Sequence, residues 1–130
     1  MTDEHASGAY LRARGVGDGT TELVLLSGEL DLATAPVVDR AVEAALKRGP
    51  ELLVLDLQGL DFCDCSGLRA LLRARLAALA EQRGFRILAP RPTVLRLISM
   101  SGCAKLLDPV PPGGAPTAPG DDPRRPPPVG

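Results

Sequence analysis

The sequence has few of the side chains on which most enzyme active sites depend. Its only histidine is His5, close to the N-terminus, so the rest of the chain offers none for a Ser-His-Asp or Cys-His arrangement or for a histidine-based zinc site. Lysine occurs only at Lys47 and Lys105, and no G-x-x-x-x-G-K-[ST] phosphate loop is present. We therefore predict that the protein is not an enzyme and that it uses no cofactor and no metal.

Aromatic residues and cysteines are also scarce. Aromatic side chains occur only three times, at Tyr10, Phe62 and Phe85. That number is too small for a platform on which nucleic-acid bases stack. The cysteines are odd in number and lack the spacing of metal ligands, and they stand at Cys63, Cys65 and Cys103. A disulfide framework is not expected from this pattern.

Long apolar runs and an excess of one charge are missing as well. No run approaches the ~18 apolar residues of a membrane-spanning helix, and residues 1–8 are too polar for a signal peptide. The formal net charge is -1, which gives no strong attraction to nucleic acid or to anionic lipid. The sequence thus predicts a cytoplasmic protein that binds neither nucleic acid nor a membrane directly.

Composition divides the chain into three parts. A polar, flexible leader is expected at residues 1–8 and a folded domain at residues 9–108. Residues 109–130 contain nine of the thirteen prolines. Such a segment cannot bury enough apolar surface to offset the entropy lost on ordering. We therefore predict a disordered Pro/Gly-rich tail over residues 109–130.

Hydrophobic periodicity in the folded part alternates between strand and helix. Strands are predicted at 9–16, 21–26, 52–57 and 85–88, helices at 35–48, 66–83 and 93–100, and a short last strand at Leu106 and Leu107. Five leucines of the second helix are predicted to face the sheet, namely Leu68, Leu71, Leu72, Leu76 and Leu79. With right-handed crossovers, this order predicts a single α/β domain with a mainly parallel mixed sheet and helices packed on it.

Two segments directly after predicted strands contain the candidate functional residues. Because ligands and partners meet open α/β sheets at the carboxyl ends of the strands, we expect these residues to lie near one edge: Asp31, Asp61, Asp64, Cys65 and Ser66. Ser66 falls at the start of the second helix. One interpretation is that Asp64, Cys65 or Ser66 caps this helix. The other is that Ser66 is a regulated hydroxyl, whose phosphate would add about two negative charges.

Three stretches of the sequence resemble the motifs of a known family, in the family's order. LDLQGLDFCDCSGLRALL resembles the signature of STAS domains, in which D-S-[ST]-G-L lies between a strand and a helix. GELDLATA is similar to the family's upstream G-E-L-D stretch, and PTVLRLISMSGCAKLL to its C-terminal helix and turn. The resemblance covers nearly all of residues 9–107, and the closest subgroup is the bacterial anti-sigma factor antagonists.

The resemblance implies both a function and a site. Such a domain binds an anti-sigma factor that is a serine kinase of the histidine-kinase-like ATPase type, and it thereby frees a sigma factor by partner switching. Asp31 would be the acid beside the acceptor serine. The residues expected to contact the partner are Asp31, Asp61, Asp64, Cys65, Ser66 and Gly67.

One departure from the motif leaves two alternatives open. Cys65 occupies the usual phosphoacceptor position, and the only hydroxyl there is the next residue, Ser66. Either Ser66 is phosphorylated, or the domain is an interaction or scaffold module without a phosphoswitch, such as a cytosolic partner of a lipid transporter. Cys65 itself could be an oxidant-sensitive thiol at a helix N-terminus or a small, inert residue in a tight turn.

Overall fold

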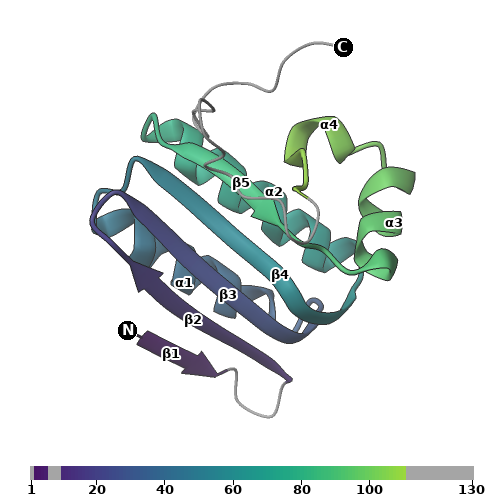
Figure 1. The fold of residues 1–130 in the computed structure, drawn as a ribbon. Coiled ribbons are helices and arrows are strands. Elements are labelled where there is room, and N and C mark those ends of the chain that lie inside the picture. The colour runs from purple at the N-terminus through teal and green to yellow at the C-terminus, as the bar shows by residue number, and fades with distance from the viewer. Residues whose placement is uncertain (1, 6–9, 111–130) are drawn as a thin grey trace.

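The structure, a computed structural model, describes residues 2–5 and 10–110 (Figure 1). Its elements in chain order are β1 (Thr2–His5), β2 (Leu11–Gly17), β3 (Thr21–Leu30), α1 (Ala35–Lys47), β4 (Leu52–Cys63), α2 (Cys65–Ala80), β5 (Gly84–Leu88), α3 (Pro92–Met100) and α4 (Ala104–Leu107). The predicted alternation of strands and helices is therefore present between β2 and α3.

The five strands form one mixed sheet in the order β1-β2-β3-β4-β5. The β1/β2 and β2/β3 pairs are antiparallel, whereas β3/β4 and β4/β5 are parallel. Strand β4 is an interior strand between β3 and β5, and its Leu53, Leu55 and Leu57 have no exposed surface. This arrangement confirms the predicted α/β domain with a mixed sheet, in which the apolar run 52–57 forms part of an interior strand.

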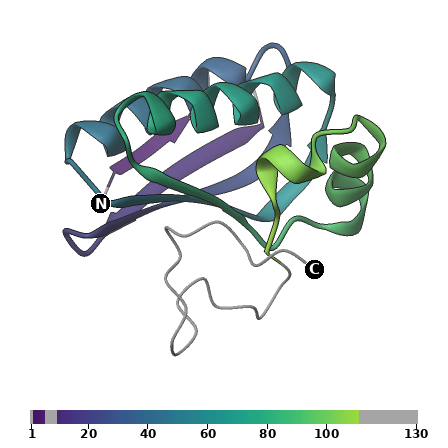
Figure 2. The same cartoon turned by 90° about the horizontal axis from the view of Figure 1, so that it is seen from above.

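Helices α1 and α2 lie side by side on one face of the sheet (Figures 1 and 2). The side of α2 that faces the core includes Leu68 and Leu71, as predicted, together with a stripe of alanines at Ala70, Ala74 and Ala78. The prediction was wrong for Leu76 and Leu79, which are 60% and 45% exposed. Small alanine side chains let a helix approach its neighbours closely. Because the alanine side of α2 packs against the core, Leu76 and Leu79 on the other side of the helix point away from the sheet.

The structure also differs from the sequence prediction near both ends of the described chain. Thr2–His5, expected in a flexible leader, forms β1 and pairs with β2. Leu106 and Leu107, expected in a short strand, belong to the helical turn α4. Val110, expected in the disordered tail, forms a parallel bridge with Leu88 at the edge of β5. The rest of the predicted tail, residues 111–130, lies outside the described residues.

Irregular pairing between β3 and β4 determines where the two strands end. Their register shifts between Leu25 and Ser27 and again between Gly28 and Glu29. At Gly28 φ is +110°, a conformation that L side chains rarely adopt. After these shifts, Leu30 pairs with Cys63, so both strands stop at the same level. The next residues of the two strands therefore enter one region at the edge of the sheet.

Candidate partner-binding site

Contacts between β3 and the start of α2 bring the two candidate segments together. The Asp64 N–H donates a hydrogen bond to the Leu30 carbonyl oxygen at 3.3 Å. A Cβ at Gly67 would lie 2.6 Å from the same oxygen and 2.9 Å from Cys63 Sγ. Gly67 is thus buried and packs against the ends of both strands. Because Gly67 has no side chain, the first turn of α2 can pack directly against the end of β3.

The cap of α2 is Asp64. Its Oδ1 accepts a hydrogen bond of 2.9 Å from the Gly67 N–H, which satisfies one of the donors at the helix start. The first two helical residues are the exposed Cys65 and the half-buried Ser66. Between the two interpretations of this segment, the structure assigns the capping role to Asp64, so the cap requires neither the Cys65 thiol nor the Ser66 hydroxyl.

Asp31 occupies the turn that joins β3 to α1. Its Oδ1 accepts from the Thr34 N–H at 3.0 Å, while its own N–H donates to Thr34 Oγ1 at 2.9 Å. The Thr34 hydroxyl also donates to the Glu29 carbonyl oxygen at 2.9 Å. This reciprocal pair holds the chain in a tight turn at the end of β3. Asp31 is therefore half-buried and has a structural role in addition to any contact with a partner.

Asp61 lies within β4 and not in a loop, because the strand continues to Cys63. Its Oδ1 is 3.1 Å from Arg91 Nη1. Arg91 Nε donates to the Gln58 carbonyl oxygen at 2.7 Å, so Arg91 links β4 to the start of α3. Sequence analysis missed this residue, because no spacing relates an arginine before Pro92 to an aspartate thirty positions earlier in the chain.

Two exposed apolar side chains accompany these polar residues. Leu32, in the turn after β3, is 75% exposed, and Phe62, next to the end of β4, is 47% exposed. Leu32 lies one residue from Asp31, and Phe62 lies between Asp61 and Cys63. Exposed large apolar residues that gather at one edge are typical of interaction surfaces. The sequence alone could have indicated Leu32 as a contact residue, because a leucine in the turn after a strand is not needed for the hydrophobic core.

The two cysteines at the site differ in exposure. Burial, and then the negative charges of Asp64 and Cys65, raise the pKa of the Cys63 thiol to about 12. Cys63 therefore stays protonated at neutral pH, whereas Cys65 is exposed to solvent. Within residues 2–5 and 10–110, the structure shows no cluster of three or more side chains that could hold a metal ion.

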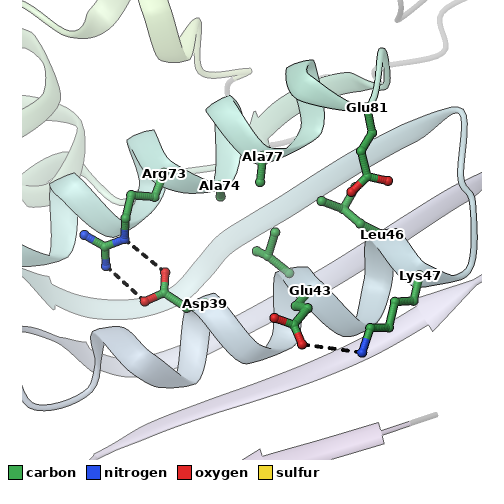
Figure 3. Close-up of a pocket in the computed structure, with 9 residues that line it drawn as sticks. Asp39, Glu43, Leu46, Lys47, Arg73, Ala74, Ala77 and Glu81 are labelled. Atoms are coloured by element: carbon green, nitrogen blue, oxygen red, sulfur yellow. Dashed lines mark hydrogen bonds and ion pairs between the residues drawn. The ribbon is translucent and has the colours of Figure 1, made fainter.

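A separate hollow of about 360 Å³ lies between α1 and α2 (Figure 3). Its floor includes Leu46, Ala74 and Ala77, and four of the charged side chains on its rim form two ion pairs. Arg73 Nη2 is 3.1 Å from Asp39 Oδ2, and Lys47 Nζ is 3.5 Å from Glu43 Oε1. None of the residues predicted to contact a partner lines this hollow. The candidate site is therefore the edge formed by the ends of β3 and β4 and the first turn of α2.

The fold and the match to a family model identify the class of protein. The model described as "Mlab, STAS domain" matches residues 16–108, which include β3, β4, all the helices and every candidate site residue. The chain belongs to the STAS domain family.

Within this family, the chain is similar to proteins named as anti-sigma factor antagonists. It is 37% identical over 87 residues to the anti-sigma F factor antagonist of Paenibacillus polymyxa, a match that covers 65% of this chain and 74% of the relative. The structure of an anti-sigma factor antagonist from Mycobacterium paratuberculosis is similar, with a TM-score of 0.69, 29% identity and coverage of 78% and 86% of the two chains.

A third similarity concerns the fold alone. The Bacillus cell fate determinant SpoIIAA in its phosphorylated form has a TM-score of 0.56, 22% identity and coverage of 72% of this chain and 85% of its own. Among the described helices of the present structure, none has the length and apolar character needed to cross a bilayer.

Proposed function

We propose that this protein is a cytoplasmic anti-sigma factor antagonist, which binds an anti-sigma factor of the serine-kinase type and so releases a sigma factor. The observation that carries the proposal is the surface around the first turn of α2. Exposed Leu32 and Phe62 lie at the strand ends beside that turn, and the Ser66 hydroxyl is not needed for the helix cap. The similarity to proteins named as antagonists supports the same function.

The chemistry of this surface defines the partner surface that would fit it. Apolar side chains contribute most to a protein interface when a pocket of the partner removes them from water. The carboxylates of Asp31, Asp61 and Asp64 add negative charge around them. A complementary partner therefore has an apolar pocket for Leu32 or Phe62 with basic residues around it.

Phosphorylation of Ser66 would disrupt this fit through the size of the phosphate, because the hydroxyl that it replaces lies where the two surfaces pack together. A phosphate adds about two negative charges and bulk at the second residue of α2. The positive end of the helix dipole would stabilise that phosphate on this chain. Its bulk would also separate the surfaces that pack around Leu32 and Phe62. Phosphorylation would thus increase dissociation of the complex without any catalysis by this protein.

The experiment combines binding and phosphorylation with one purified anti-sigma kinase. We expect Ser66→Asp to weaken binding at least about tenfold, which corresponds to roughly 1.4 kcal/mol, and Ser66→Ala to bind normally but to resist release by ATP. Ser99→Asp, which adds the same charge at an exposed position of α3, is the matched control and should bind like the parent. Equal binding by all three variants would refute the proposed surface.

A second candidate function follows from Cys65 at the usual acceptor position. A STAS module that binds its partner without a phosphoswitch would still use Leu32 and Phe62. Leu32→Ser should then weaken binding, while ATP and kinase would leave the complex intact and Ser66 unmodified by mass spectrometry. Cys65→Ser restores the acceptor of the family motif. Phosphate on this variant, but not on the parent, would show that the chain keeps the binding function and has lost the switch.

A further inference from the structure

The face of the sheet opposite α1 and α2 carries an apolar strip. Side chains alternate between the two faces along a strand, and Val24, Leu26, Leu53 and Leu55 belong to the core beneath the helices. The intervening side chains therefore point to the opposite face. The apolar ones are the partly exposed Leu23, Leu25 and Leu88 and the buried Leu52 and Val54. Figure 2 shows both long helices on the other side of the sheet.

A hollow of about 410 Å³ lies on this second face, next to the apolar strip. Leu25 of β3 and Asp56 of β4 contribute to its lining, and Arg12 and Arg14 of β2 form its basic side. Arg91, which holds Asp61 of the candidate site, lines it as well. The second face therefore combines an apolar centre with positive charge on β2, and it reaches the region of the partner-binding site.

The described chain ends beside this face. The Val110 N–H donates to the Ile87 carbonyl oxygen at 2.8 Å, and the Ala89 N–H donates to the Val110 carbonyl oxygen at 2.6 Å. Val110 is thus held along the outer edge of β5, where Leu88 belongs to the apolar strip. The 20 residues that follow start from a fixed point at the border of the second face.

The length and the composition of this following segment suit the surface. At about 3.1 Å per residue in an extended proline-rich chain, the path from Val110 to Asp121 can reach about 34 Å. The distance from β5 to β2 is three strand spacings, about 14 Å. The eight prolines of residues 111–130 have no N–H that would lose a water partner on an apolar surface. Asp121 and Asp122 are opposite in charge to the arginines of β2.

We propose that residues 111–130 dock on the second face of the sheet, with the proline-rich part across the apolar strip and with Asp121 and Asp122 near Arg12 and Arg14. A tethered segment has an effective concentration in the millimolar range, which favours it over a second copy of the chain. This proposal differs from the expectation of a disordered tail, because composition alone does not show the surface that the tail would find.

Cross-linking in the full chain tests the proposal. In a background with Cys65→Ser and Cys103→Ser, Ala118→Cys is combined with Ser27→Cys on the second face or with Ala80→Cys on the exposed side of α2. A short bis-maleimide is added to dilute protein, and cross-links within one chain are quantified by mass spectrometry. We expect the Ser27→Cys pair to react about tenfold faster than the Ala80→Cys pair.

Charge reversal distinguishes docking from chance encounters. Arg12→Glu should reduce the advantage of the Ser27→Cys pair, and adding Asp121→Arg and Asp122→Arg should restore it. Equal rates for the two cysteine pairs would overturn the proposal, since a tail without a docking surface meets both positions. Cross-links that join two chains and increase with protein concentration would also overturn it, because a second copy would then occupy the face.

Discussion

Replacing Gly28 with alanine should destabilise the domain strongly, for two reasons that can be separated. Gly28 has φ of +110°, in a region that alanine avoids. An added Cβ would also overlap the carbonyl oxygen of Tyr10, the acceptor of the Glu29 N–H at 2.8 Å. The substitution therefore strains the backbone and pushes β2 away from β3 at the point where the site begins.

The magnitude follows from these two effects. Strained backbone conformations cost about 1–3 kcal/mol, and overpacking against a structure that cannot move costs about 1–3 kcal/mol or more. We expect a loss of about 3–5 kcal/mol, a large part of the roughly 5–15 kcal/mol by which small domains are stable. In urea denaturation followed by circular dichroism, the midpoint should fall by about 2 M for a slope of about 2 kcal/mol per M.

Three other glycines provide matched controls. Gly15 has a free Cβ position and no positive φ, Gly19 has φ of +93° with open space, and Gly67 has a blocked Cβ position within a helix. Gly15→Ala should therefore change the free energy of unfolding little. Gly19→Ala should lower it through backbone strain alone, and Gly67→Ala through the overlap of the added Cβ alone. If Gly28→Ala is no more destabilising than Gly19→Ala, the overlap with Tyr10 is relieved without cost and the argument is wrong.

Three further predictions concern the core and the buried charges. Leu71→Ala should lower the free energy of unfolding by about 2–5 kcal/mol, because Leu71 has no exposed surface. Leu76→Ala, at a residue that is 60% exposed, should change the free energy of unfolding by no more than about 0.5 kcal/mol. Equal urea midpoints for the two variants would contradict the orientation of α2. Arg48→Met should lower the free energy of unfolding by about 1–3 kcal/mol, because the buried carboxylate of Glu22 loses the Arg48 guanidinium at 3.3 Å. Lys47→Met, which removes the exposed ion pair with Glu43, should have little effect on the free energy of unfolding. Between pH 9 and about 12, the Cys63 thiol ionises in the unfolded chain but stays protonated in the folded one, since burial raises its pKa to about 12. Stability should therefore fall as the pH rises through this range, and the fall should be smaller in Cys63→Ala when urea midpoints are compared at pH 8 and pH 10.

Much of the fold could be predicted from the sequence because its strongest patterns are local. The run 52–57 is apolar apart from Asp56, which is typical of an interior strand, and β4, with a neighbouring strand on each side, confirms it. The faces of α2 were harder to assign, because leucine and alanine alternate over more than one side of the helix. Whether the alanine-rich or the leucine-rich side of α2 packs on the sheet depends on how closely the helix approaches its neighbours. The spacing of apolar residues in the sequence does not predict that distance.

The site was predictable in position but not in its contacts. That the ends of β3 and β4 lie at one edge follows from their parallel order, since parallel strands end on the same side of a sheet. The pairing of Asp61 with Arg91 depends on how two segments thirty residues apart pack together. The reciprocal bonds of Asp31 with Thr34 are local, but they depend on the backbone conformation of the turn. The partner-binding roles of Asp31, Asp61, Asp64, Cys65, Ser66 and Gly67 stay predictions until binding is measured.

The bonds between Asp31 and Thr34 have a consequence for how this surface can evolve. One carboxylate oxygen of Asp31 is already used by the Thr34 N–H, so the fold needs an acceptor at that position whether or not a partner is bound. Asp31→Asn can keep the acceptor and remove only the charge, whereas Asp31→Ala removes both. A descendant of this chain could therefore change its partner through Leu32 and Phe62 and still keep aspartate or asparagine in place of Asp31, because the turn itself selects for a side-chain acceptor there.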